Sequence, residues 1–275
     1  MLLKSVATKP IEKWHNLRHS LLNYKITKFD PKVKFEDKVS KYIIKTAQTE
    51  DEIREVLELR HLVFIEEGLG EQRFGGVDFA KFDLLGDHIL VKDTSTNVTI
   101  GTYRMMCSLF TDEFYSETEF HMSEFFDTFG TKLELGRACI HPDYRTGASI
   151  NLVWKGLGRY SNLVDARFMF GCSSVKTTNK IIAEAITEFY RAQGRIAPWD
   201  ITARRKFQFK PKDSRFEPFD MNDMSSHVPS LMQSYIAAGA MIGAQGAYDR
   251  EFRCTDFLTL LDMNTIAEKY RKRYL

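Results

Sequence analysis

The sequence lacks the features that define several classes of protein. Its four cysteines are far apart and form no C-x-x-C pair, which disfavours a zinc site or a redox dithiol. No apolar run approaches the roughly 20 residues of a membrane span, and no early run suits a signal peptide. The formal net charge of +2 is close to zero, so nothing global indicates nucleic acid. We therefore expect free thiols in a cytoplasmic protein, with no metal site and no nucleic-acid partner.

Basic charge is concentrated at the start of the chain. Residues 1–38 hold nine Lys or Arg against four Asp or Glu, and apolar residues recur at helical spacing over 10–24. Such a helix usually packs its apolar stripe onto the domain, but it can also lie on an anionic membrane surface. We predict an amphipathic N-terminal arm over residues 1–40, and peripheral contact with the inner membrane face stays an alternative.

From residue 41 onward, strand and helix patterns alternate. A strand at 42–46 is followed by Thr49-Glu50-Asp51-Glu52, a capping-box sequence that starts a helix. The other strands expected are at 88–93, 98–107, 133–140, 168–172 and 257–261, and the other helices at 113–129, 149–164, 179–192 and 229–238. This order predicts one α/β domain over residues 41–275, with hairpin-linked strands first and crossover helices later.

Two opposite charges interrupt the apolar strand at Leu133-Glu134-Leu135-Gly136-Arg137. Side chains alternate along a regular strand, so a spacing of three places Glu134 and Arg137 on opposite faces. A bulge at Gly136 would bring both to one face. Buried charges are costly unless they act together or each has a partner. The stretch alone leaves a structural ion pair and a functional site equally open.

Several further motifs, taken in order, resemble a known group of enzymes. Those shared with the acyl-homoserine-lactone synthases are Leu59-Arg60, Val63-Phe64, Phe82-Asp83, Gly101-Thr102-Tyr103-Arg104 and Glu134-Leu135-Gly136-Arg137. Asp87-His88-Ile89, the run from Cys139 to Arg145, and Phe170-Gly171-Cys172-Ser173 resemble more closely the ornithine-lipid N-acyltransferases and the long-chain N-acyl amino acid synthases. The resemblance covers residues 41–263. It implies the GNAT fold, a central mixed twisted sheet flanked by helices, here with an N-terminal helical arm.

One segment departs from the GNAT pattern. Enzymes of this fold that use coenzyme A have a glycine-rich R-x-x-G-x-G/A loop whose backbone N–H groups bind the pyrophosphate. This chain has Tyr144-Arg145-Thr146-Gly147-Ala148 there, with one glycine and different spacing. The change argues against acetyl-CoA and suits a donor carried by acyl carrier protein.

The resemblance implies that a fatty acyl group, 3-hydroxylated, passes from acyl carrier protein to the amine of an amino acid such as ornithine. No cofactor is expected besides the carrier's phosphopantetheine thioester. Glu134 is the candidate general base, and Arg104 and Arg137 complete the catalytic set. Substrate binding is assigned to Arg60, Phe64, Asp83 and Asp87, and carrier-protein docking to Arg145, Lys155 and Arg159, with residues 204–206 as another candidate.

Three points stay open in the sequence. The acyl-homoserine-lactone synthases carry an acid where this chain has Ala80, and Asp78 is the nearest substitute. The aromatic residues of 114–129 either line the acyl cavity or form plain core. Two other functions also fit: a coenzyme-A-dependent GNAT acetyltransferase acting on a small amine, and a non-enzymatic, membrane-binding protein of the hemolysin-like kind.

Overall fold

The computed structural model describes residues 21–216 and 224–274. Most of the predicted arm helix over residues 10–24, including Lys13 and Arg18, lies outside these residues. The arm's described part is helical over 21–26 and includes strand β1 (Glu36–Val39), which pairs with β2 (Tyr42–Thr46). The sheet thus begins before residue 41, where the catalytic domain was expected to start.

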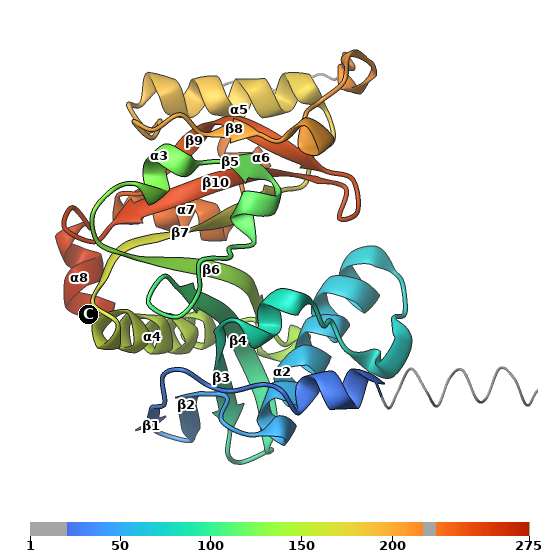
Figure 1. Ribbon diagram of the computed structural model, residues 1–275, viewed down its shortest axis with the longest axis vertical. Coiled ribbons are helices and arrows are strands. Elements are labelled where there is room, and N and C mark those ends of the chain that lie inside the picture. The colour runs from blue at the N-terminus through green and yellow to red at the C-terminus, as the bar shows by residue number, and fades with distance from the viewer. Residues whose placement is uncertain (1–20, 217–223, 275) are drawn as a thin grey trace, which may run out of the picture. The chain divides into compact units, whose positions relative to one another are not determined.

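The fold is built on a mixed eight-stranded sheet with the strand order β1-β2-β3-β4-β6-β7-β10-β9 (Figure 1). The chain divides into two compact units: unit 1 comprises residues 1–102 and 139–153, and unit 2 comprises 103–138 and 154–275. Strands β4 (Val98–Cys107) and β6 (Thr131–Ile140) each contribute residues to both units.

Unit 1 packs helix α2 (Glu50–Arg60) on the antiparallel strands β2 and β3 (Asp87–Asp93). The predicted capping box is confirmed, since the Thr49 side chain accepts the N–H of Glu52 at 3.2 Å. Ile53, Val56 and Leu57 form the buried stripe. The helix continues as a π-helix, η1 (His61–Glu67), a form that is frequent at functional sites.

Unit 2 is built around the antiparallel strands β7 (Ala166–Val175), β10 (Cys254–Asp262) and β9 (Met241–Asp249). Helices α5 (Lys180–Ala192) and α7 (Ser230–Ala238) bury one hydrophobic cluster with β7, β9 and β10. Helix α4 (Gly147–Leu163) connects β6 to β7, and α8 (Glu268–Tyr274) ends the described chain. Within the described residues, no helix has both the length and the apolar character to cross a bilayer.

The predicted aromatic helix over 113–129 is wrong. That segment contains a 3-10 turn, η4 (Ser116–Thr118), a two-residue strand β5 (Phe120–His121) that pairs with β8 (Thr202–Ala203), and one helical turn, α3 (Ser123–Phe126). Its rings Phe114, Phe125 and Phe126 pack against Phe170 of β7 instead of following a helical stripe. Tertiary packing therefore overrides the local periodicity. Residues 241–249, for which the sequence predicted no element, form strand β9.

Strand β6 changes course at the charged motif. Its parallel pairing with β7 runs from Thr131↔Ala166 to Glu134↔Phe170. The irregularity predicted at Gly136 falls one residue later, because Arg137 is left-handed with φ 56°. A Cβ built on Gly171 would lie 2.1 Å from the carbonyl oxygen of Leu135. The two backbones approach closely at that point, and only glycine fits.

Gly171→Ala should therefore destabilise unit 2 by about 3 kcal/mol, because a backbone carbonyl, unlike a side-chain tip, cannot move aside. Thermal unfolding followed by circular dichroism measures the loss. Gly147→Ala is the control, since a Cβ there meets nothing within 4 Å, and it should leave the melting temperature unchanged or slightly raised. Equal melting temperatures for Gly171→Ala and the parent protein would contradict the close approach.

Candidate active site

In unit 1, a buried ion-pair cluster surrounds Arg60. Its guanidinium donates to Asp78 Oδ2 at 2.8 and 3.0 Å and to Asp83 Oδ1 at 2.7 Å. All three residues are at most 1% exposed, and the two carboxylates raise the pKa of Arg60 even though burial alone would lower it. Asp83 and Asp78 are thus the two acids of this cluster. Asp83 also accepts the N–H of Ala80 at 2.7 Å.

The other substrate-binding candidates of unit 1 lie in different settings. Asp87 is buried and accepts the backbone N–H groups of Lys32 and Val33 at 2.8 and 2.9 Å, so its observed contacts hold the chain before β1. Phe64 lies half-buried in the π-helix η1.

In unit 2, Glu134 is 2% exposed and both of its carboxylate oxygens are bonded. Oε2 accepts the N–H of Tyr115 at 2.8 Å, and Oε1 accepts the N–H of Ser116 at 2.6 Å. Burial raises the pKa of Glu134, while the charge of Arg104 and these hydrogen bonds oppose the rise. A carboxyl with a raised pKa inside a strand is typical of a general acid or base.

The two candidate arginines of unit 2 both lie against Tyr115. The guanidinium carbons of Arg104 and Arg137 are each 5.6 Å from its ring centroid, and that of Arg137 is 5.0 Å from the ring of Phe252. Gly136 leaves room for Arg104, because a Cβ there would be 3.4 Å from its Nη2. The structure thus brings Arg104, Glu134 and Arg137 together around one tyrosine.

Sequence reasoning missed an acidic group beside this cluster. Glu119 follows the turn held by Glu134, and Cys172 Sγ lies 3.7 Å from its Oε2. Asp249 and Asp256 come from β9 and β10, and their carboxylates lie with the Cys254 thiol within 4.8 Å of one another. Asp256, like Glu134, is a carboxylate within an apolar strand, and this feature of the sequence could have identified it. Glu119 lies in no such pattern.

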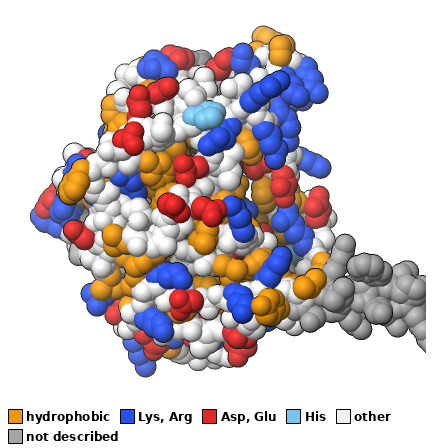
Figure 2. Space-filling model, viewed as in Figure 1, with side chains coloured by type: hydrophobic (Ala, Val, Ile, Leu, Met, Phe, Trp, Pro, Cys, Tyr) orange, Lys and Arg blue, Asp and Glu red, His pale blue; other side chains and the backbone are white. Residues whose placement is uncertain are grey.

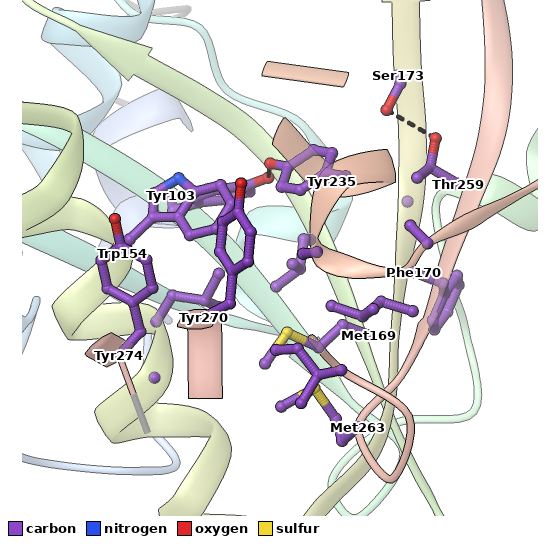
Figure 3. A pocket seen from close by; sticks show the side chains of 18 of the residues that line it. Tyr103, Trp154, Met169, Phe170, Ser173, Tyr235, Thr259, Met263, Tyr270 and Tyr274 are labelled. Atoms are coloured by element: carbon purple, nitrogen blue, oxygen red, sulfur yellow. Dashed lines mark hydrogen bonds between the residues drawn. The ribbon is translucent and has the colours of Figure 1, made fainter. Parts of the chain in front are cut away.

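An apolar pocket opens on the other face of β7 and β10 (Figure 3). The consecutive residues Met169 to Ser173 of β7 all border the pocket, although the Cys172 thiol is directed to Glu119. The pocket's rings come from strand β4 and helices α4, α7 and α8: Tyr103, Trp154, Tyr235, Tyr270 and Tyr274. Its volume is about 60 Å³, so it is a narrow slot.

The aromatic residues expected to line an acyl cavity do not line this pocket. Phe114, Phe120 and Phe125 are at most 4% exposed and form core, while Phe129 is 97% exposed. Phe114, Phe120 and Phe125 are therefore core residues, which is the second of the two predicted alternatives.

The docking candidates are split between the two units. In unit 1, Arg145 pairs with Glu67 through both guanidinium nitrogens, at 2.5 Å from Nη1 to Oε1. In unit 2, Lys155 and Arg159 are exposed on α4. On the face shown in Figure 2, Lys and Arg side chains gather at the upper right and elsewhere mix with Asp and Glu. The assignment of these residues to docking stays a prediction.

The chain is similar to several known proteins. Residues 59–155 match a family model described as an acetyltransferase (GNAT) domain. The chain is 28% identical over 246 residues to an L-ornithine N(alpha)-acyltransferase of Rhodobacter capsulatus, covering 85% of this chain and 94% of the relative. It is 29% identical over 245 residues to the Rhizobium meliloti enzyme of the same name, covering 83% of this chain and 82% of the relative.

Two solved structures are also similar. The acyl-homoserine-lactone synthase LasI aligns with a TM-score of 0.47 at 12% identity, covering 85% of this chain and 94% of that one. FeeM, an N-acyl amino acid synthase from uncultured soil microbes, aligns with a TM-score of 0.49 at 7% identity, covering 85% and 96%.

The mixed sheet and the GNAT match indicate an acyltransferase with a GNAT-like fold. Over most of their length, the chain is similar to the L-ornithine N(alpha)-acyltransferases, at 28–29% identity. The predicted fold and enzyme class are confirmed, and the non-enzymatic alternative is set aside.

Arg60→Met should lower the free energy of unfolding by about 3–5 kcal/mol, because it leaves two buried carboxylates without their cation. Urea denaturation measures the change. Lys272→Ala removes only an exposed pair with Glu268 and should cost less than about 1 kcal/mol. The triple variant Arg60→Met, Asp78→Leu, Asp83→Leu should recover part of the loss. A loss below about 1 kcal/mol in Arg60→Met would show that the cluster does not stabilise unit 1.

Proposed function

We propose that this enzyme transfers a 3-hydroxylated fatty acyl group from acyl carrier protein to the α-amino group of a basic amino acid such as ornithine. The product would be an N-acyl amino acid or lyso-ornithine lipid. One observation carries this proposal: within unit 2, an apolar pocket and a buried carboxylate with two guanidinium groups lie on the same strands. The names of the relatives support the acceptor.

The acceptor would be held by opposite charges. A free amino acid presents a carboxylate, and a guanidinium binds a carboxylate in a planar, two-pronged geometry. Arg104 and Arg137 flank Tyr115 and supply that group. The α-amine would then lie at Glu134, between the arginines and the turn at Ser116.

The reaction requires the α-ammonium to lose a proton, because only the neutral amine attacks a thioester. Glu134 takes that proton, and burial has already raised the pKa of its carboxyl. The amine nitrogen bonds to the carbonyl carbon and gives up a second proton as the carbon–sulfur bond breaks. One of the two protons protonates the departing thiolate, and the other is released to solvent. Backbone N–H groups near Gly136, where β6 leaves its regular path, would stabilise the oxyanion.

The acyl tail would enter the pocket of Figure 3, which is apolar along most of its lining. The slot is too narrow for a long chain in this state. Helix α8 covers it with Tyr270 and Tyr274, whose ring centroids lie 5.8 and 5.1 Å from that of Trp154. Opening of these rings would admit the chain.

The donor is tested by comparing substrates at equal concentration. Purified enzyme with ornithine receives a 3-hydroxyacyl group on acyl carrier protein, the same group on coenzyme A, or acetyl-CoA. Mass spectrometry should detect N-acylornithine with the first donor at the highest rate. Product from acetyl-CoA alone would overturn the proposal in favour of a coenzyme-A-dependent acetyltransferase.

Glu134→Gln should lower kcat by about 10²–10⁴-fold while the KM for the acyl carrier protein changes little, because the amide cannot accept the proton. For the parent enzyme, kcat/KM should rise with pH through the raised pKa of Glu134, since only the ionised carboxylate accepts a proton. This rise of kcat/KM with pH should be absent in Glu134→Gln. Glu188→Gln, an exposed residue of α5 paired with Arg191, is the control. If kcat/KM of Glu134→Gln still rises with pH in the same range, another group is the base.

The double variant Tyr270→Ala, Tyr274→Ala should shift the enzyme toward longer or bulkier acyl groups, because it removes the two rings that close the slot. Competition between 3-hydroxyacyl carrier proteins of different chain lengths measures the shift, with products counted by mass spectrometry. Lys272→Ala, exposed on the same helix, should leave the distribution unchanged. An unaltered distribution in the double variant would mean that the tail lies elsewhere.

A further inference from the structure

Three buried carboxylates gather beside the candidate site in unit 2. Glu119, Asp249 and Asp256 are 0%, 6% and 3% exposed. Asp249 and Asp256 lie on the paired strands β9 and β10, and Glu119 follows the turn whose N–H groups Glu134 holds. Three acids in one buried place carry a large cost unless a cation balances them.

One carboxylate oxygen in this group lacks a hydrogen bond. Among the described residues, Glu119 Oε1 is buried without any hydrogen-bond partner, while the side chain also bonds to Tyr115 and Asp256. Asp249 uses its Oδ1 for the backbone N–H groups of Glu251 and Phe252, at 2.7 and 3.2 Å. A buried acceptor left unsatisfied is rare and indicates a missing donor.

The charges of the group repel one another when no cation is bound. Burial raises the pKa of Glu119, and the negative charge of Asp256 raises it further. Burial also raises the pKa of Asp256, with a further rise from Asp249, while the hydrogen bond from Ser174 and the charge of Arg137 lower it. A positively charged hydrogen-bond donor would relieve both the repulsion and the missing bond.

We propose that Glu119, Asp249 and Asp256 bind the side-chain ammonium of the acceptor amino acid. The inference rests on the proposed function and narrows its acceptor to diamino acids. An alkylammonium has three N–H donors, which suits three surrounding carboxylates. Its positive charge would reduce the repulsion among the three carboxylates.

The position of the group fits this role. Burial raises the pKa of the Cys172 thiol, and the negative charges of Glu119, Asp256 and Glu134 raise it further. The acidic group therefore lies beside Glu134, the carboxylate that would meet the α-amine. A diamino acid could thus place its carboxylate at Arg104 and Arg137, its α-amine at Glu134 and its second ammonium at Glu119. Three separate contacts would fix which of the two amines is acylated.

A divalent metal is the competing occupant, since Asp249, Cys254 and Asp256 lie close enough to share one ion. A chelator separates the two occupants, because it removes a metal ion and leaves an ammonium site unchanged.

The test compares ornithine with norvaline, which has the same carbon chain but no second amine. Parent enzyme should favour ornithine by about a hundredfold in kcat/KM, because norvaline leaves the carboxylates unpaired. Glu119→Gln and Asp256→Asn should each reduce that preference to within about threefold, mainly by raising the KM for ornithine. Glu188→Gln is the control and should keep the preference.

Two outcomes would overturn the inference. If both acceptors lose activity equally in Glu119→Gln, the group serves the fold or the chemistry and not acceptor choice. If treatment with EDTA abolishes the activity of the parent enzyme and a divalent metal restores it, the group binds a metal.

Calorimetric titration separates failure of this inference from failure of the proposed function, because it needs no turnover. Parent protein should bind ornithine at least about tenfold more tightly than norvaline, and Glu119→Gln should bind them equally. Tight ornithine binding without N-acylation would contradict the proposed function and leave the ammonium site standing. If N-acylornithine forms but the two amino acids bind equally, the proposed function stands and the ammonium site is contradicted.

Discussion

The carboxylate of Glu134 is buried in strand β6 and accepts two backbone N–H groups from a segment 18 and 19 residues earlier in the chain. That contact fixes the turn at Ser116 and, through it, the position of Tyr115 and Glu119. The arginines at 104 and 137 then lie against the ring of Tyr115. A single buried carboxylate therefore organises the acidic group, the guanidinium groups and the reacting centre.

Strands β7 and β10 separate the charged groups of unit 2 from its apolar pocket. Side chains on one face, such as Cys172 and Asp256, meet charged groups, and those on the other, such as Met169 and Leu261, line the apolar pocket. Strand alternation alone achieves this division. An amphiphilic product has a polar head and an apolar tail, and a two-faced sheet holds the two parts in different environments.

The elements with strong local signals could be predicted from the sequence, and those that depend on distant packing could not. Thr49 and Glu52 marked the start of α2, and the charges of Glu134 and Arg137 marked the interrupted strand. Residues 113–129 have helix-like spacing of aromatic residues, yet their rings are held by Phe168, Phe170 and Trp199. The spacing of aromatic residues along the sequence does not reveal that packing. Glu119 was missed because its neighbours Asp249 and Asp256 lie more than a hundred residues away in the chain.

The central claim is that a buried carboxylate and an apolar slot together acylate an amino acid. The most direct measurement is mass spectrometry of total lipids from bacteria that express the parent protein or Glu134→Gln. The account predicts a new lipid in the parent strain alone, with one 3-hydroxyacyl chain in amide linkage to a diamino acid. Absence of any new acylated amino acid, or equal amounts of it in both strains, would contradict the account.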